Sequence, residues 1–454
     1  MEKKQKNQYF HIHFIGIGGV SMSALATFML SHDAFVSGSD QVVSHFTTNL
    51  ESKGALIYYG HKAENIPFNC DLVVYTGAVQ SGNPEFIEAQ KRGIKLMERS
   101  EFLGYVASMY ENVIAISGTH GKTTTTSMIG KIFLTAKLNP TIHLGGESDD
   151  FGGNMFLGNN RTFITEACEY RDSFRYLSPQ IALITNIEKD HTDYYKNMTQ
   201  IMTAFAHFGN NSQVLVVFEN NEILDYIDKK VKVVTCGFDG DYDVKGYNLS
   251  KDKDGCYSFD VKNNGIYLGH FRLGVIGLHN AKNALCAIAI SVLCGITYDK
   301  MYYALKSFIG IKRRYEKVGE YKGVPVICDY AHHPTEIANS IKGALTSHKK
   351  ILCIFQPHTY SRTLSLMPEF AHCFKGVHRL VVYKTYPARE KPINGGRAID
   401  LLNNVVGFRD RKFYCYSKRC LSKTMKEMDK TYDLILVLGA GDIYDIIKQI
   451  ITKI

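Results

Sequence analysis

The chain has 454 residues, of which 45% are hydrophobic and 21% charged, so we expect a globular protein of two or three domains. Lys and Arg (53) outnumber Asp and Glu (44), and the net charge of +9 suits phosphate-bearing ligands, but no Lys/Arg block is dense enough to predict a nucleic-acid-binding arm. The 11 cysteines form no CxxC pair, the N-terminus lacks the apolar segment of a signal peptide, and no apolar run approaches the ~20 residues of a membrane helix, so we expect a cytoplasmic protein with reduced thiols and no membrane partner.

The first hundred residues alternate short apolar segments with helical ones. Strands are predicted at 11–17, 34–36 and 71–75, and helices at 21–30 and 84–92. This βαβ rhythm is typical of an α/β domain with a parallel sheet and helices on both faces. We assign residues 1–108 to such a Rossmann-like domain.

Two further α/β units follow. The second, residues 109–310, is predicted to have a parallel sheet with strands at 112–117, 162–167, 181–186, 213–218 and 232–236, short hairpins in the polar stretch 239–269, and helices from about 123 and over 279–294. The third, residues 311–454, is predicted to be Rossmann-like, with strands at 324–330, 350–355, 379–383 and 433–438.

The sharpest motif is Ser-Gly-Thr-His-Gly-Lys-Thr-Thr at 117–124, between a predicted strand and a helix. Its glycines allow backbone N–H groups to face a phosphate chain, and the helix N-terminus adds partial positive charge. Lys122 would reach the β- and γ-phosphates, and the Thr123 hydroxyl would hold Mg²⁺. Ile116 occupies the first glycine position of the strict P-loop pattern. The alternative is a glycine-rich turn that binds nothing.

A second glycine loop, Gly16-Ile17-Gly18-Gly19-Val20-Ser21, follows the first predicted strand. It is similar to the dinucleotide fingerprint GxGxxG, although Ser21 replaces the last glycine, and Asp40 lies at a suitable distance to meet a ribose hydroxyl. By itself the loop indicates either a diphosphate site or a tight turn that requires glycine.

Polar residues follow several predicted strands. Glu166 ends one strand, and Asp190 and His191 follow another, where the ligand crevice of an open parallel sheet lies. A carboxylate and an imidazole there could complete a Mg²⁺ site with Thr123, although Mg²⁺ prefers oxygen ligands and His191 is equally explained by structural hydrogen bonds. In the last third, the segments 329–334 and 356–362 gather His, Tyr, Arg and Asp side chains that suit a small zwitterion.

Taken together and in order, these motifs resemble the Mur ligase family over essentially the whole chain. The segments that carry the resemblance are HFIGIGGVSMS (13–23), SGTHGKTTT (117–125), EACEYRDSF (166–174), TNIEKDH (185–191), GLHNAKNA (277–284), GIKRRYE (310–316), DYAHHPTE (329–336), FQPHTYSRT (355–363), YPAREKP (386–392) and LGAGDI (438–443). The alanine-adding branch is the most similar, since Ala204-Phe205-Ala206-His207 lacks the modified lysine of several sister ligases.

The resemblance implies an ATP-dependent ligase that joins L-alanine to UDP-N-acetylmuramate through an acyl phosphate, with Mg²⁺ or, as an alternative, Mn²⁺. The catalytic residues would be Lys122, Glu166 and His191, and the metal ligands Thr123, Glu166 and His191. ATP would contact Gly118, Thr119, His120, Gly121, Lys122, Thr123, Thr124, Asn280, Asn283, Arg314 and Asp329. The UDP-sugar would contact Gly16, Gly18, Gly19, Ser39, Asp40 and His61, and L-alanine Tyr330, His332, His358 and Arg362.

Other functions remain open at this stage. A sister ligase that attaches a whole tripeptide to the same sugar nucleotide would need a larger amine pocket. An NAD-dependent oxidoreductase would leave SGTHGKTTT without a role, and a non-catalytic nucleotide-binding regulator would not need Lys122, Glu166 and His191 together. The proton acceptor is open among His191, His332 and His358. A monomer or a homodimer is expected.

Overall fold

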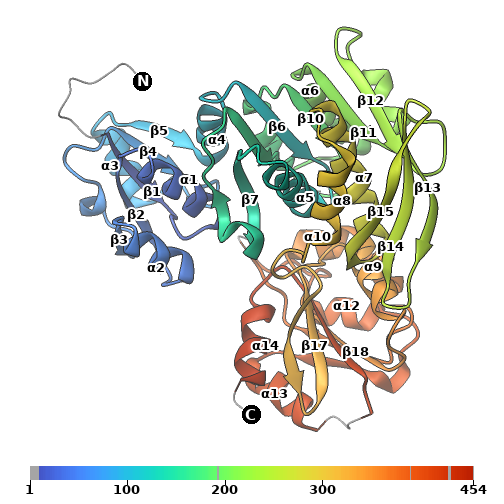
Figure 1. Cartoon of the computed structure of the whole chain (residues 1–454). Helices are drawn as coiled ribbons and strands as arrows, with labels where there is room; N and C mark the ends of the chain where they lie inside the picture. The colour runs from blue at the N-terminus through green and yellow to red at the C-terminus, as the bar shows by residue number, and fades with distance from the viewer. Residues whose placement is uncertain (1–9, 192–193, 389, 428–430, 453–454) are drawn as a thin grey trace.

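The computed structural model describes residues 10–191, 194–388, 390–427 and 431–452. Three β-sheets, each flanked by helices, follow one another along the chain, which confirms the predicted α/β organisation in three units (Figure 1). The N-terminal unit (blue) lies beside the central one, and the C-terminal unit (orange to red) lies below it. In the described part of the chain no helix is long and apolar enough to cross a membrane.

The N-terminal sheet is parallel throughout, in the order β3-β2-β1-β4-β5. Its elements are β1 (His11–Ile15), α1 (Val20–Leu30), β2 (Phe35–Asp40), α2 (His45–Ser52), β3 (Leu56–Tyr59), β4 (Leu72–Tyr75), α3 (Pro84–Lys91), β5 (Lys95–Glu98) and α4 (Arg99–Ala107). β2 runs further than the sequence predicts, so Ser39 and Asp40 form its carboxyl end beside the glycine loop. The sequence did not predict the two edge strands, β3 and β5, or the helices α2 and α4 next to them.

The central sheet has ten strands in the order β15-β14-β13-β12-β11-β10-β6-β9-β7-β8. Its elements are β6 (Asn112–Ser117), α5 (Lys122–Thr135), β7 (Thr141–Ser148), β8 (Gly153–Phe156), β9 (Thr162–Glu166), β10 (Ile181–Ile184), α6 (Met198–Asn210), β11 (Val214–Phe218), β12 (Lys232–Gly237), β13 (Val244–Lys251), β14 (Cys256–Asn263), β15 (Ile266–Ile276), α7 (Leu278–Leu293) and α8 (Tyr298–Lys306). The predicted parallel arrangement holds in the middle of the sheet. At both edges the sheet is antiparallel, through β8 on one side and β14 and β15 on the other, so the sheet is mixed.

The C-terminal sheet has the order β16-β17-β21-β18-β19-β20 and is parallel except for β16. Its elements are β16 (Glu316–Tyr321), β17 (Val324–Asp329), α9 (Pro334–Ala344), β18 (Ile351–Phe355), α10 (Tyr360–Ser365), α11 (Met367–His372), β19 (Arg379–Tyr383), α12 (Ala398–Asn404), β20 (Lys412–Cys415), α13 (Lys418–Lys426), β21 (Leu434–Leu438) and α14 (Ile443–Ile451). Short 3₁₀ helices complete the chain at Ala63–Asn65, Asp149–Phe151, Tyr170–Tyr176, Asn221–Tyr226 and Arg409–Arg411.

One apolar core joins the first two units. It runs from Phe14 on β1 through Phe102 on α4 to Phe163 on β9 and Phe205 on α6. The C-terminal sheet has separate cores on its two faces, around Phe355 and Ile447. We retain residues 1–108, 109–310 and 311–454 as proposed domain boundaries.

Candidate active site

The loop between β6 and α5 has the backbone that phosphate binding requires. Gly118 (φ 136°) and Gly121 (φ 83°) both adopt conformations that favour glycine. A Cβ atom on Gly118 would lie 2.0 Å from the Thr185 hydroxyl, and one on Gly121 would lie 2.5 Å from Asn283 Oδ1. Gly121 is the N-cap of α5, so the loop delivers backbone N–H groups to a helix N-terminus.

The segment after β10 holds this loop in place. The His120 N–H donates to Asn186 Oδ1 (2.9 Å), and the Thr119 hydroxyl accepts from the Glu188 N–H (2.8 Å). The Thr185 hydroxyl donates to the carbonyl oxygen of His120 (2.8 Å). These three hydrogen bonds fix the conformation of the loop.

Lys122 is held by a buried carboxylate that sequence reasoning did not single out. Its ammonium donates to both oxygens of Glu169, at 3.1 and 2.8 Å, and also contacts the carbonyl oxygens of Gly118 and Thr119. His191 Nε2 lies 3.2 Å from the same carboxylate. Burial opposes the charge on Glu169, but Lys122 and His191 outweigh it and lower the pKa of Glu169 to about 2.

The predicted metal ligands are only partly brought together. The Thr123 hydroxyl donates to Glu166 Oε2 at 3.0 Å, and the N–H of Gly145 donates to Oε1. Burial raises the pKa of Glu166, so this carboxylate lies where a cation would stabilise its charged form. His191 instead contacts Glu169 and Asp190, at 3.2 and 3.8 Å.

A cavity of about 740 Å³ opens between the central and C-terminal units next to the loop. Seven residues predicted to contact ATP line it: His120, Gly121, Thr124, Asn280, Asn283, Arg314 and Asp329. They come from the loop before α5 and its first turn, from α7, from the segment before β16 and from the end of β17, so the fold gathers segments separated by about two hundred residues. The other predicted ATP residues, Gly118, Thr119, Lys122 and Thr123, lie on the adjoining loop and first turn of α5.

The four residues predicted to bind the amino acid also lie together. The rings of Tyr330 and His332 are 5.4 Å apart, those of His332 and His358 are 5.7 Å apart, and Arg362 Nη1 lies 3.3 Å from His358 Nδ1. Burial lowers the pKa of His332 to about 4 and that of His358 to about 3, so both rings are neutral at neutral pH.

Arg362 also joins the two units. Its Nε and Nη2 atoms donate to the two oxygens of Asp190, at 3.0 and 3.3 Å, and both side chains are largely buried. Burial opposes the charge on Asp190, but Arg362 outweighs it and holds the pKa of this carboxyl well below its usual range. The sequence predicted Asp190 only as a polar residue that follows a strand. It gave no indication that Arg362 of the C-terminal unit would be its partner.

The glycine loop of the N-terminal unit meets the end of β2. Gly16 has φ 83°, and Gly19 is the N-cap of α1. The Gly18 N–H donates to Asp40 Oδ2 (2.9 Å), and the Ser39 hydroxyl lies 3.0 Å from His61 Nδ1. The predicted residues of the UDP-sugar site thus lie at the carboxyl ends of β1 and β2 and just beyond β3.

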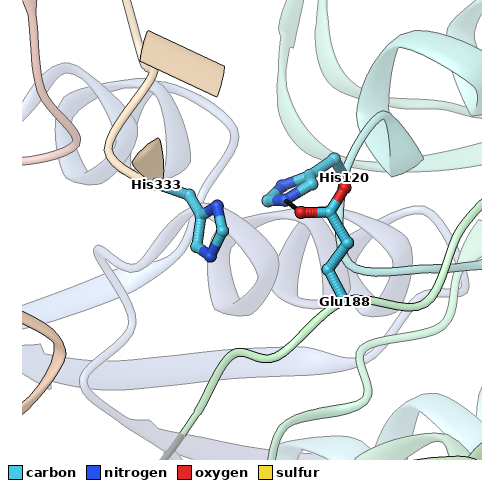
Figure 2. Close-up of side chains that lie close together, drawn as sticks. All are labelled: His120, Glu188 and His333. Atoms are coloured by element: carbon cyan, nitrogen blue, oxygen red, sulfur yellow. Dashed lines mark ion pairs between the residues drawn. The ribbon is translucent and has the colours of Figure 1, made fainter. Parts of the chain in front are cut away.

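A second contact between units surrounds His120, on the phosphate loop. His120 Nδ1 lies 3.1 Å from Glu336 Oε1 on α9, and its Nε2 lies 3.5 Å from Glu188 Oε2 (Figure 2). His333 lies opposite, with ligand atoms of His120, Glu188 and His333 within 4.8 Å of one another. Both His333 nitrogens already have protein partners, the Thr335 N–H and the Lys189 carbonyl oxygen, so we interpret the group as a contact between units rather than a metal site.

The charge on His120 should make this contact sensitive to pH. Burial opposes that charge, but Glu336 and Glu188 outweigh it and raise the pKa of His120 to about 9, against about 6.5 for an ordinary histidine. A raised folded-state pKa adds stability that is complete below about pH 6.5 and is lost as pH rises through about 9. We expect the thermal-unfolding midpoint to fall over this window more in the wild type than in Glu336→Gln. Parallel curves for the two proteins would contradict this.

Comparison with known proteins gives the family. Family models match all three units: the Mur ligase family catalytic domain at residues 11–111, the Mur ligase middle domain at 116–291 and the Mur ligase glutamate ligase domain at 313–441. A UDP-N-acetylmuramate–L-alanine ligase of Clostridium botulinum is 43% identical over 452 residues, which cover 98% of this chain and 97% of the relative. The chain belongs to the Mur ligase family. A protein of the same name from Clostridium tetani is 43% identical over 442 residues, covering 95% of this chain and 96% of the relative.

Solved structures of Mur ligases agree with this fold. The UDP-N-acetylmuramate–alanine ligase of Thermotoga maritima has a TM-score of 0.83 at 29% identity, covering 98% of this chain and 99% of the other. A murein peptide ligase of Psychrobacter arcticus has a TM-score of 0.75 at 26% identity, with 98% of both chains covered.

Sequence reasoning missed several carboxylates of this Mur ligase site. Glu169 lies three residues after Glu166, in a segment already singled out, and that spacing was a usable signal. Glu336 could also have been predicted from the sequence. The order His333-Pro334-Thr335-Glu336 is typical of a helix start, in which the side chain of the third helical residue, Glu336, accepts from the backbone N–H of the N-cap residue, His333. Glu188 gave no such signal, since its partners lie on the loop and on α9.

Proposed function

We propose that this chain is a UDP-N-acetylmuramate–L-alanine ligase, which uses ATP to join L-alanine to the lactyl carboxylate of UDP-N-acetylmuramate in peptidoglycan precursor synthesis. The observation that carries the proposal is the 43% identity to clostridial enzymes of that name along essentially the whole of both chains. The cavity between the units supports it, because it collects the residues expected to bind ATP. We also propose a cytoplasmic location and a monomer or a homodimer.

In the proposed reaction the lactyl carboxylate attacks the γ-phosphorus of ATP, the bond from that phosphorus to the bridging oxygen breaks, and an acyl phosphate and ADP result. The N–H groups of the loop and the α5 N-terminus bind the phosphates. The Lys122 ammonium leaves part of its contact with Glu169 and offsets the charge that spreads over the transferring phosphoryl oxygens.

The residues around Glu166 fit a divalent cation. The Thr123 hydroxyl and the half-buried Glu166 carboxylate provide oxygen ligands 3.0 Å apart, the ligand chemistry that Mg²⁺ prefers. We propose Thr123, Glu166 and His191 as the residues that hold Mg²⁺, or Mn²⁺ in its place. The bound cation would supply positive charge to the phosphate oxygens.

The second half of the reaction needs a neutral amine and a dry site. The L-alanine amine attacks the acyl phosphate, and phosphate leaves through a tetrahedral intermediate. The candidates for the acceptor of the ammonium proton are His191, His332 and His358. Burial keeps the rings of His332 and His358 neutral, but their low pKa values also make them weak bases. The Asp190–Arg362 pair keeps the C-terminal unit against the central one and helps to exclude water.

Phosphate release from ATP and Mg²⁺ with UDP-N-acetylmuramate tests the proposal. L-Alanine, D-glutamate and a wall tripeptide are added one at a time. We expect release with L-alanine alone. Release with the tripeptide alone would make the chain a wall-recycling ligase, and no release with any acceptor would refute ligation at this carboxylate.

A further inference from the structure

A fully buried carboxylate, Glu85, lies beneath the proposed UDP-sugar site. It is in the first turn of α3 and is 0% exposed. Its Oε1 accepts from the Asn65 side-chain amide (2.5 Å) and the Lys62 N–H (3.2 Å). Its Oε2 accepts from the Ser39 hydroxyl (2.5 Å), and His13 Nε2 lies 3.5 Å away. Both oxygens are therefore surrounded by donors.

These contacts fix the direction of each hydrogen bond. Burial alone would raise the pKa of Glu85, but hydrogen bonds from His13, Ser39 and Asn65 outweigh it and lower that pKa, so the group is ionised and only accepts. The single hydroxyl hydrogen of Ser39 points to Glu85. Ser39 Oγ must then accept from His61 Nδ1, 3.0 Å away. A neutral His61 ring that carries its hydrogen on Nδ1 has a lone pair on Nε2.

The topology places His61 where a nucleotide base would lie. In a Rossmann-like sheet the diphosphate lies at the loop after β1, and the ribose lies at the end of the neighbouring strand, here Asp40 on β2. β3 is the next strand outward, and His61 follows it directly. The His61 side chain is 18% exposed whereas that of Glu85 is fully buried, so the histidine is the part of this network that a ligand can reach.

We propose that the Glu85–Ser39–His61 relay presents His61 Nε2 as an acceptor for the N3–H of uracil, and so selects uridine over cytidine nucleotides. Uracil carries a hydrogen on N3, whereas cytosine presents a lone pair there. His61 is the specificity-determining residue, and Glu85 and Ser39 are positioning residues that act through it. The inference rests on the proposed function only in assuming a uridine nucleotide at this site.

Direct binding to the full chain tests the relay without turnover. Calorimetry would measure the affinities of UDP, CDP and 3-methyl-UDP, whose N3 has a methyl group in place of hydrogen. We expect the wild type to bind UDP about 10-fold to 100-fold more tightly than either analogue, the effect of one unsatisfied polar group at a buried contact. His61→Ala should bind the three alike. His32→Ala, at an exposed position just after the C-terminal end of α1, should keep the wild-type preference.

Glu85→Gln gives the sharper result. The amide oxygen should occupy the position facing Asn65 and the Lys62 N–H, which leaves the NH₂ group facing Ser39. The Ser39 hydroxyl then accepts from Gln and donates to His61 Nδ1, so the ring hydrogen moves to Nε2. We expect this variant to lose the preference for UDP and to bind CDP better than the wild type does. If Glu85 has only a structural role, Glu85→Gln should lower the affinities for UDP, CDP and 3-methyl-UDP by the same factor.

Three outcomes overturn the inference: equal binding of UDP and 3-methyl-UDP by the wild type, an unchanged preference in His61→Ala, or an unchanged preference in a Glu85→Gln protein with a wild-type unfolding midpoint. Failure of the proposed function is distinguishable, because it would appear as no phosphate release with L-alanine while UDP still binds selectively.

Discussion

Replacing Lys122 with methionine is expected to slow phosphate release by about a thousandfold, because the transferring phosphoryl group loses the Lys122 ammonium that offsets its charge. Methionine keeps an unbranched side chain only one atom shorter than that of lysine, so the loop held by Asn186 and Thr185 should keep its shape. The measurement is single-turnover phosphate release with saturating ATP. A loss of less than about tenfold would place the proposed phosphate contact elsewhere.

The same change should also destabilise the protein. Among the residues that the structure describes, the Glu169 carboxylate would keep only its ion pair with His191. Removing one partner of a buried ion pair lowers the free energy of unfolding by about 3 kcal/mol. Adding Glu169→Gln to the Lys122 variant should recover most of that stability but none of the activity. Recovery of both would mean that Lys122 acts on the fold and not on the phosphoryl group.

Truncating Arg362 to alanine should lower kcat/KM for L-alanine by about 100-fold. The change removes a cation beside His358 and leaves Asp190 buried without its bidentate partner, a loss that typically costs 2–5 kcal/mol, and ~1.4 kcal/mol is a tenfold effect. Initial rates at varied L-alanine, with ATP and the sugar nucleotide saturating, would measure this. Arg362→Lys should recover little, because lysine lacks the planar fork.

A double variant separates the two roles of Arg362. Asp190→Asn combined with Arg362→Ala removes the stranded charge, so stability should return while the KM for L-alanine stays high. Full recovery of kcat/KM in the double variant would show that Arg362 only joins the units and does not contact the amino acid.

Local patterns carried most of what the sequence could predict. The glycine loop at 117–124 was predictable because an apolar strand, glycines with unusual backbone angles and a helix start are contiguous. β7 was missed because Gly145, Gly146 and a buried His143 interrupt the apolar pattern of that stretch, and β8 was missed because it has only four residues. β14 and β15 were predicted only as short hairpins, since one face of this edge of the sheet is exposed and polar.

The side-chain contacts that organise the site could not be predicted from the sequence, for a different reason. Glu85 pairs with Ser39, 46 residues away, and Asp190 pairs with Arg362, 172 residues away. A single sequence contains no signal for such distances, because only the folded sheets decide which strand ends lie side by side. The types of residue at the site were therefore predictable, but their pairing was not.

The apolar core shared by the first two units has a consequence for motion. Phe14, Phe102 and Phe163 belong to one continuous packing, so the N-terminal and central units cannot separate without exposing it. The C-terminal unit meets them instead through polar pairs such as His120–Glu336 and Asp190–Arg362, which water can replace. Opening for entry and exit of nucleotides should therefore be a swing of the last 140 or so residues against a rigid two-domain base.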